Sequence, residues 1–230
     1  MANAKPSTAI KQDGPVREDN GEKRTQAERR AESDRQILRA ATRLIAKRGA
    51  MSVSLAQIGL EAGYSRGLPA ERFGTKVNLL NAVVTASDAW FRKWCLEPAI
   101  KDTTGVDRLR KRLKAHMVTI RDSTEPTMTL YQLMMDSIVA IPELKPRVQE
   151  LNRQYRRDVS ADLIEAVEAG EVWPDLDIDA HALQAVAAMH GVTVQWLIER
   201  DAFDMNEAIR RVLNQFADTI DLSNASSKIC

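Results

Sequence analysis

The chain has 230 residues, a net charge of +1, only 5% aromatic residues and two cysteines. Helix-forming residues dominate and the prolines fall near segment ends, which favours an all-α protein. Cys95 and Cys230 are too few and too far apart for a disulfide framework, and no apolar stretch follows the N-terminus as a secretory signal requires. The most apolar window, residues 180–198, carries two histidines, two glutamines and a threonine, so we expect a cytoplasmic protein without a membrane span.

Charge is distributed unevenly along the chain. Residues 1–100 hold 17 Lys and Arg against 11 Asp and Glu, whereas the remainder holds 16 against 21. This asymmetry favours an N-terminal part that binds a polyanion, although the solvated faces of helices can also differ in charge by chance.

The N-terminal part predicts a flexible arm followed by a long helix. Residues 1–25 are polar, contain glycines and prolines and show no periodicity, which is typical of an unstructured segment. A helical apolar stripe then starts at Ser33 and includes Ile37, Ala41 and Leu44. Basic residues and Gly49 mark its end at Arg48.

Three further capping signals predict a helix-turn-helix. Ser54 and Gln57 form a capping box that opens a short helix ending at Gly63. Ser65 can cap a third helix that runs to Phe73, and Thr75 can cap a fourth that starts at Lys76 and runs to Leu96. Two short helices joined by a glycine turn and flanked by longer helices are typical of this DNA-binding motif.

Longer helices are predicted after Pro98. We expect them at residues 104–123, 126–140, 143–170, 178–200 and 205–222, with breaks at prolines. The domains would then be an arm (1–25), a helix-turn-helix domain (26–93, with the motif at about 54–73), a helical domain (94–223) and a disordered tail (224–230).

The segment GYSRGLPAERFGTK, residues 63–76, is the strongest candidate site. It fails as a phosphate loop because the glycine spacing is wrong, the order is Gly74-Thr75-Lys76 and no strand precedes it. A helix opening at Ser65 would instead present Arg66 to a DNA groove, with Lys76 holding a second phosphate. Pro69 would be the fourth helical residue and would forfeit only the first intrahelical bond. The alternative is that these are solvated surface charges.

Residues 33–93 resemble the DNA-binding domain of the TetR/AcrR family of transcriptional regulators. The resemblance rests on features at consistent spacing: Ala40-Ala41, Gly49, Ile58, Ala62-Gly63, Ser65, Gly67, Phe73-Gly74 and Lys76. It implies that the residues facing DNA are Ser54, Ala56, Ser65, Arg66, Gly67, Leu68, Ala70, Glu71, Arg72 and Lys76. Pro69, Ala70 and Glu71 depart from the family pattern, and Ala70 replaces a customary tyrosine.

The same resemblance implies a C-terminal ligand-binding domain and a homodimer that pairs through the last two long helices. Their apolar stripes look wider than one protomer needs. Candidate liners of a ligand pocket are Met117, Tyr131, Met134, Met135, Ile138, Tyr155, Trp173, Met189 and Trp196, with His116, His190 or Arg121 as polar anchors. Such a stripe can also be plain core.

We therefore expect a ligand-responsive regulator of double-stranded DNA. The preferred interpretation is a repressor released from a near-palindromic operator by a small apolar or aromatic effector. An activator remains an alternative, as does an all-α dimeric scaffold or enzyme without DNA binding. No residue spacing indicates catalysis, a metal site or a cofactor.

Overall fold

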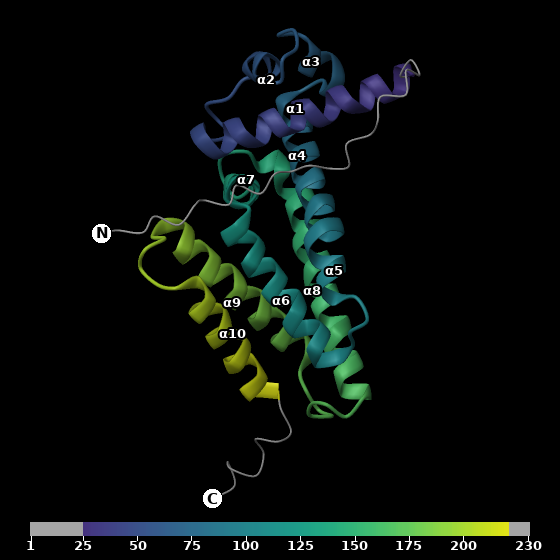
Figure 1. Ribbon diagram of the computed structural model, residues 1–230, viewed down its shortest axis with the longest axis vertical. Helices are drawn as coiled ribbons and strands as arrows, with labels where there is room; N and C mark the ends of the chain where they lie inside the picture. Colours follow the sequence, from purple (N-terminus) through teal and green to yellow (C-terminus); the bar gives the residue numbers. More distant parts are fainter. Residues whose placement is uncertain (1–24, 221–230) are drawn as a thin grey trace, which may run out of the picture.

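The computed structural model describes residues 25–220, with side chains to residue 216, and is helical throughout, without a strand in that range. Figure 1 shows a small helical unit, α1 to α3, joined through α4 to an elongated bundle. The helices are α1 (Gln26–Arg48), α2 (Leu55–Glu61), α3 (Leu68–Phe73), α4 (Lys76–Phe91), η1 (Arg92–Leu96), α5 (Glu97–Ile100), α6 (Gly105–Asp122), α7 (Thr124–Asp136), η2 (Pro142–Leu144), α8 (Lys145–Glu168), α9 (Ile178–Ile198) and α10 (Met205–Ile220). The expected all-α fold is confirmed. The expected arm up to residue 24 and the tail lie outside the described residues, as does Cys230.

Helix α1 begins at Gln26, so the predicted start at Ser33 is wrong. Thr25 caps the helix, because its hydroxyl accepts from the backbone N–H of Glu28 at 3.1 Å while Glu28 accepts from the backbone N–H of Thr25 at 2.9 Å. This capping box satisfies two N–H groups that would otherwise lack partners. The polar turns before the apolar stripe are therefore helical and extend α1 beyond the N-terminal core.

Helix α2 opens at the predicted capping box. The Ser54 hydroxyl accepts from the Gln57 N–H at 3.2 Å, and the Gln57 side chain accepts from the Ser54 N–H at 2.9 Å. The turn that follows passes through Gly63 at φ 78°, a left-handed conformation that favours glycine. The sequence thus locates this half of the helix-turn-helix correctly.

Helix α3 begins at Leu68 and is capped by Gly67, so the prediction of Ser65 as the cap is wrong. Ser65 lies in the preceding turn, where its carbonyl accepts from the Leu68 N–H at 3.3 Å. Pro69 is therefore the second helical residue, at a position whose N–H has no partner within the helix. The expected loss of one intrahelical bond does not occur, and the first bond runs from the Glu71 N–H to the Gly67 carbonyl at 3.0 Å.

Helix α4 continues past Phe91 into the π-helical turn Arg92–Leu96, and then into the short helix α5. The expected end at Leu96 thus corresponds to the end of the π turn. Pro98 does not stop the chain from being helical, because it lies in the first turn of α5.

The described residues form two hydrophobic cores. The first joins α1, α2 and α4 to Leu133 of α7, Leu144 of η2 and Val148 of α8. The second fills the bundle between α6, α8, α9 and α10. Because the first core includes residues of the bundle, the N-terminal unit is packed against α7 and α8 rather than tethered by α4 alone.

The apolar stripe of α10 serves the protomer's own core. Ile209, Leu213 and Phe216 are buried among residues of the bundle. Among the side chains described up to residue 216, the exposed large apolar residues of α9 and α10 lie on α9, where Leu183 is 55% and Ile198 74% exposed. Among residues 25–220 no helix is both long and apolar enough to cross a membrane.

Candidate functional site

Helices α2 and α3 contact each other at Gly59 and Pro69, which are both buried. A Cβ on Gly59 would stand 2.5 Å from the Ser65 carbonyl oxygen and 3.0 Å from Pro69 Cδ. Gly59 therefore has no room for a side chain. The proline ring fills the contact between the helices, which gives Pro69 a packing role in the motif.

Arg72 is turned toward α1 and not outward. Its Nε and Nη2 atoms donate to the two carboxylate oxygens of Asp34 at 2.7 and 2.6 Å, and Nη2 also donates to the Arg30 carbonyl at 3.1 Å. The hydrogen bond that Arg72 donates to Asp34 raises the pKa of Arg72. A two-pronged contact of this kind fixes geometry as well as charge, so Arg72 anchors α3 to α1.

Most of the other residues expected to face DNA are exposed. Exposed members are Ser54, Ser65, Arg66, Gly67, Ala70 and Glu71, while Ala56 and Leu68 are half-buried. Lys76 is half-buried at the start of α4, where its Nζ donates to the Met51 carbonyl at 3.1 Å and burial lowers its pKa. Arg66 is the exposed cation of α3 and the turn before it.

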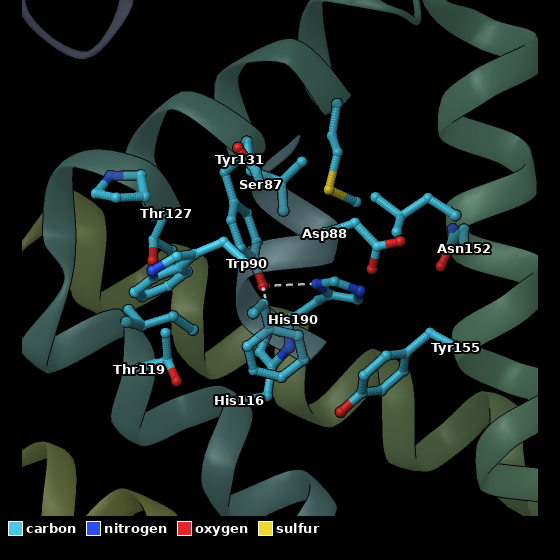
Figure 2. Close-up of a pocket in the computed structure, with 16 residues that line it drawn as sticks. Ser87, Asp88, Trp90, His116, Thr119, Thr127, Tyr131, Asn152, Tyr155 and His190 are labelled. Atoms are coloured by element: carbon cyan, nitrogen blue, oxygen red, sulfur yellow. Dashed lines mark hydrogen bonds between the residues drawn. The ribbon is translucent and has the colours of Figure 1, made fainter. Parts of the chain in front are cut away.

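A second candidate site is a cavity inside the bundle, close to the middle of the molecule. The cavity has a volume of about 70 Å³. Its walls come from α4, α6, α7, α8 and α9, and Figure 2 shows the aromatic rings of Trp90, Tyr131, Tyr155, His116 and His190 around it. The lining residues are Ser87, Asp88, Trp90, Phe91, His116, Thr119, Ile120, Pro126, Thr127, Leu130, Tyr131, Met134, Leu151, Asn152, Tyr155 and His190.

The expected pocket residues divide into two groups. Tyr131, Met134 and Tyr155 line the cavity, as do both candidate anchors His116 and His190. The others lie outside its lining: Met117, Met189 and Trp196 are buried in the bundle core, Met135 and Ile138 are exposed, Trp173 lies in the loop before α9, and Arg121 pairs with Asp122 at the surface. Helical spacing alone could not tell core from cavity wall on these helices.

A hydrogen-bonded chain of three rings crosses the cavity wall. The Tyr131 hydroxyl lies 2.6 Å from His190 Nδ1 and 3.4 Å from His116 Nε2 (Figure 2). Burial lowers the pKa of His116 to about 3 and that of His190 to about 4, and it raises the pKa of Tyr131. All three rings are therefore uncharged at neutral pH.

Asp88 is the one carboxylate in the cavity wall, and it belongs to an ion-pair network. Arg92 lies 3.1 Å from Asp88 and 2.9 Å from Asp158 of α8, and Arg147 lies 3.7 Å from Asp88. Deeper in the bundle, Arg112 pairs with Asp162 at 2.6 Å. This network ties the end of α4 to α8 and offsets the charge of Asp88.

Four lining residues on α4 were missing from the expected pocket: Ser87, Asp88, Trp90 and Phe91. Trp90 and Phe91 lie in the last turn of that helix, where the sequence predicted no pocket residue. An aromatic pair just before a break in the α-helix was the available signal. Within residues 25–220 no group of three His, Cys, Asp or Glu side chains is placed to hold a metal ion.

Comparisons with known proteins agree with this architecture. Residues 105–221, just over half of the chain, match the family model of the BetI-type transcriptional repressor C-terminal domain, and residues 37–83 match that of the bacterial regulatory proteins of the tetR family. No curated protein sequence matches the chain.

Solved structures share the fold at low sequence identity. A TetR transcriptional regulator from Chloroflexus aurantiacus is 18% identical, with a TM-score of 0.75 over 84% of this chain and 98% of that one. A Saccharomonospora viridis protein solved with choline is 20% identical (TM-score 0.73, 83% and 98% covered). The regulator FadR from Bacillus subtilis, solved with stearoyl-CoA, is 18% identical (TM-score 0.67, 79% and 96% covered). On the two family matches, the chain belongs to the TetR family of transcriptional regulators, with a DNA-binding and a ligand-binding domain.

Proposed function

We propose that the protein is a repressor whose dimer binds a near-palindromic operator and leaves it when a small apolar or aromatic effector enters the central cavity. The observation that carries this proposal is the course of α4. Its first residue, Lys76, follows shortly after α3 of the helix-turn-helix. Its last turns supply Ser87, Asp88, Trp90 and Phe91 to the cavity wall. One helix thus belongs to both candidate sites.

The size of the cavity supports a link between binding and movement. Its volume of about 70 Å³ is smaller than the ~150 Å³ apolar cavity that takes up a benzene molecule. We therefore expect an aromatic effector to displace wall side chains. Because α4 contributes four of them, displacement favours a different position of α4 and of the recognition helix attached to it.

The exposed face of α2, α3 and the turn between them is the proposed DNA contact. Arg66 would reach a phosphate or a guanine edge, and Lys76 would hold a phosphate. Gly67 has a φ of −85°, and a Cβ there would meet no atom of the protein within 4 Å. Nothing inside the described protein requires glycine at this position, which supports close approach of its backbone to DNA.

Dimerisation is proposed through α9 and α10. The exposed side of α9 carries Leu183, Ala187, Ala188, Gly191 and Ile198, a row of small residues between two larger apolar ones. Small residues let two helices approach closely, and a two-fold axis would place two recognition helices on successive major grooves.

Two proteins of this fold were solved in complex with compounds of different chemistry, one with choline and one with stearoyl-CoA. For this chain the aromatic walls and uncharged imidazoles favour an apolar or aromatic compound. A screen by thermal shift should therefore begin with uncharged aromatic compounds, with choline and stearoyl-CoA as charged comparisons.

The test is retention of the DNA upstream of the protein's own gene. Wild-type protein should bind that DNA in a sequence-selective and salt-dependent manner, and Arg66→Ala and Lys76→Ala should weaken binding. Arg153→Ala on the surface of α8, 53% exposed, is the matched control and should bind as wild type does. The regulator proposal fails if wild-type protein shows no selective retention.

Direction of regulation needs a second measurement. A reporter driven by the same upstream DNA should be expressed more strongly when the gene for the regulator is deleted. Lower expression after deletion would identify an activator and overturn the repressor part of the proposal.

A further inference from the structure

We propose that the effector is an uncharged molecule that carries one hydrogen-bonding group on an aromatic body, and that the Tyr131 hydroxyl binds this group. The inference rests on the proposed function, because it names the chemical class of ligand for the same cavity. It goes beyond that function by excluding ions and by assigning the polar contact to one residue.

The hydroxyl of Tyr131 is a hydrogen-bonding group in the cavity wall whose contacts differ in strength. A phenol can donate one hydrogen bond and accept others. Its short contact is the 2.6 Å one to His190, the 3.4 Å distance to His116 is near the limit for a hydrogen bond, and the Thr193 side chain also interacts with it. A ligand group placed in the cavity can therefore replace the long contact to His116 at small cost.

The His116 ring also has a nitrogen atom without a hydrogen-bond partner. Its Nδ1 atom is buried and has no hydrogen-bond partner among the described residues. A buried polar nitrogen without a partner is costly, so a small shift of the ring that improves its bonding would be favourable when a ligand enters. The contact between Tyr131 and His116 is thus the weaker link of the three-ring chain, and His116 keeps one unpartnered nitrogen.

Neighbouring aromatic rings hold the hydrogen-bonded chain of His190, Tyr131 and His116 in place. His116 packs edge-on against Phe91 with centroids 5.3 Å apart, against Tyr155 at 5.4 Å and against His190 at 5.7 Å. Such edge-to-face contacts favour a defined arrangement of aromatic rings. An aromatic ligand body can extend this cluster, while its polar group meets the hydroxyl.

Charge argues against an ionic effector. His116 and His190 are uncharged at neutral pH, so they offer no cation to a carboxylate. Asp88 is already paired with Arg92 at 3.1 Å and lies 3.7 Å from Arg147, so it offers little to an ammonium group. Burying an ion without a counter-charge is strongly unfavourable.

Calorimetric titration with four one-ring probes tests the inference on the full-length protein. The probes are phenol, toluene, benzoate and benzyltrimethylammonium. Phenol should bind about tenfold more tightly than toluene, the usual effect of one hydrogen bond, and both ions should bind more weakly than phenol. Tighter binding of either ion, or no binding of any probe, would overturn the inference.

Variants then assign the contact. In Tyr131→Phe the affinities of phenol and toluene should become nearly equal. Tyr64→Phe is the control, because Tyr64 packs against the N-terminal core and does not line the cavity, so the preference for phenol should persist. A preference that survives in Tyr131→Phe contradicts the assignment. The wild-type comparison needs no variant and stands even if Tyr131→Phe fails to fold.

Failure of the inference and failure of the proposed function give different results. The titrations contain no DNA and report only on the cavity. If phenol binds with the expected preference but bound operator is not released at saturating phenol, the proposed release mechanism fails while the ligand class stands. If a ligand of another class binds and releases the operator, the release mechanism stands while the inferred ligand class fails.

Discussion

The ring of Pro69 lies against the backbone of Gly59, and this contact sets the distance between the two helices of the DNA-binding motif. A Cβ on Gly59 would come within 3.0 Å of Pro69 Cδ and 2.5 Å of the Ser65 carbonyl oxygen. Because the second neighbour is backbone, it cannot rotate away. The separation of α2 and α3 is therefore coupled to the absence of a side chain at Gly59.

Gly59→Ala should push α3 away from α2. Forcing an extra methyl group into a packed contact costs about 1–3 kcal/mol, so thermal stability and operator affinity should both fall. Gly67→Ala is the matched control for stability, since a Cβ there meets nothing within 4 Å. We expect Gly67→Ala to melt as wild type does and to lose operator affinity only. Equal melting temperatures for Gly59→Ala and wild type would contradict the packing argument.

Salt dependence should separate the roles of two arginines. Arg66 is exposed and would neutralise a phosphate or read a base edge, whereas Arg72 is held by Asp34 at 2.6 Å. If Arg66 neutralises a phosphate, Arg66→Ala should reduce the slope of log affinity against log salt by about 1. Arg72→Ala and Asp34→Ala should weaken binding by misplacing α3 while leaving that slope nearly unchanged. A slope change for Arg72→Ala would place its guanidinium on the DNA.

Stability should fall as the pH drops below neutrality. An unfolded histidine has a pKa near 6.5, whereas the folded values are about 3 for His116 and about 4 for His190. The unfolded chain therefore binds more protons between pH 6.5 and 4, and the free energy of unfolding decreases as pH falls through this window. At pH 5 the loss should be about 2 kcal/mol per histidine relative to pH 7.5, as measured by urea denaturation.

His190→Gln provides the control for this pH dependence. The glutamine amide can still accept a hydrogen bond from Tyr131 but does not titrate. The decrease between pH 7.5 and 5 should therefore be smaller by about 2 kcal/mol than in the wild type. An unchanged decrease would show that other groups cause it.

Arg112→Met should destabilise the bundle. Asp162 is only 2% exposed and would lose its 2.6 Å and 3.1 Å hydrogen bonds from Arg112. Removing one partner of a buried pair costs about 3–5 kcal/mol, and we expect the lower end because Arg108 remains 3.3 Å from the same carboxylate. The double variant Arg112→Met with Asp162→Leu should recover part of the loss in chemical denaturation. A double variant less stable than Arg112→Met would contradict this explanation.

Local chemistry in the sequence determined most helix boundaries and the DNA-binding motif. The capping box of Ser54 and Gln57 placed the start of α2, and the Thr75 cap placed the start of α4, because these signals act between residues three apart. The cap at Thr25 was equally local and could have been recognised. The wrong start predicted for α3 had a different origin. Serine is a residue type that often caps helices, so Ser65 was chosen as the cap. The packing of Pro69 on Gly59 instead accompanies a helix that begins three residues later.

Long-range contacts decided the rest. Arg72 could have faced DNA from its position in α3, and only the contact with Asp34, 38 residues away in the chain, turned it inward. The cavity likewise depends on five helices, and Trp90 lines it while Met117 is core for reasons that no single helical stripe contains. Periodicity tells which face of a helix is buried, but whether that face meets side chains or a hollow is settled by how the other helices pack around it.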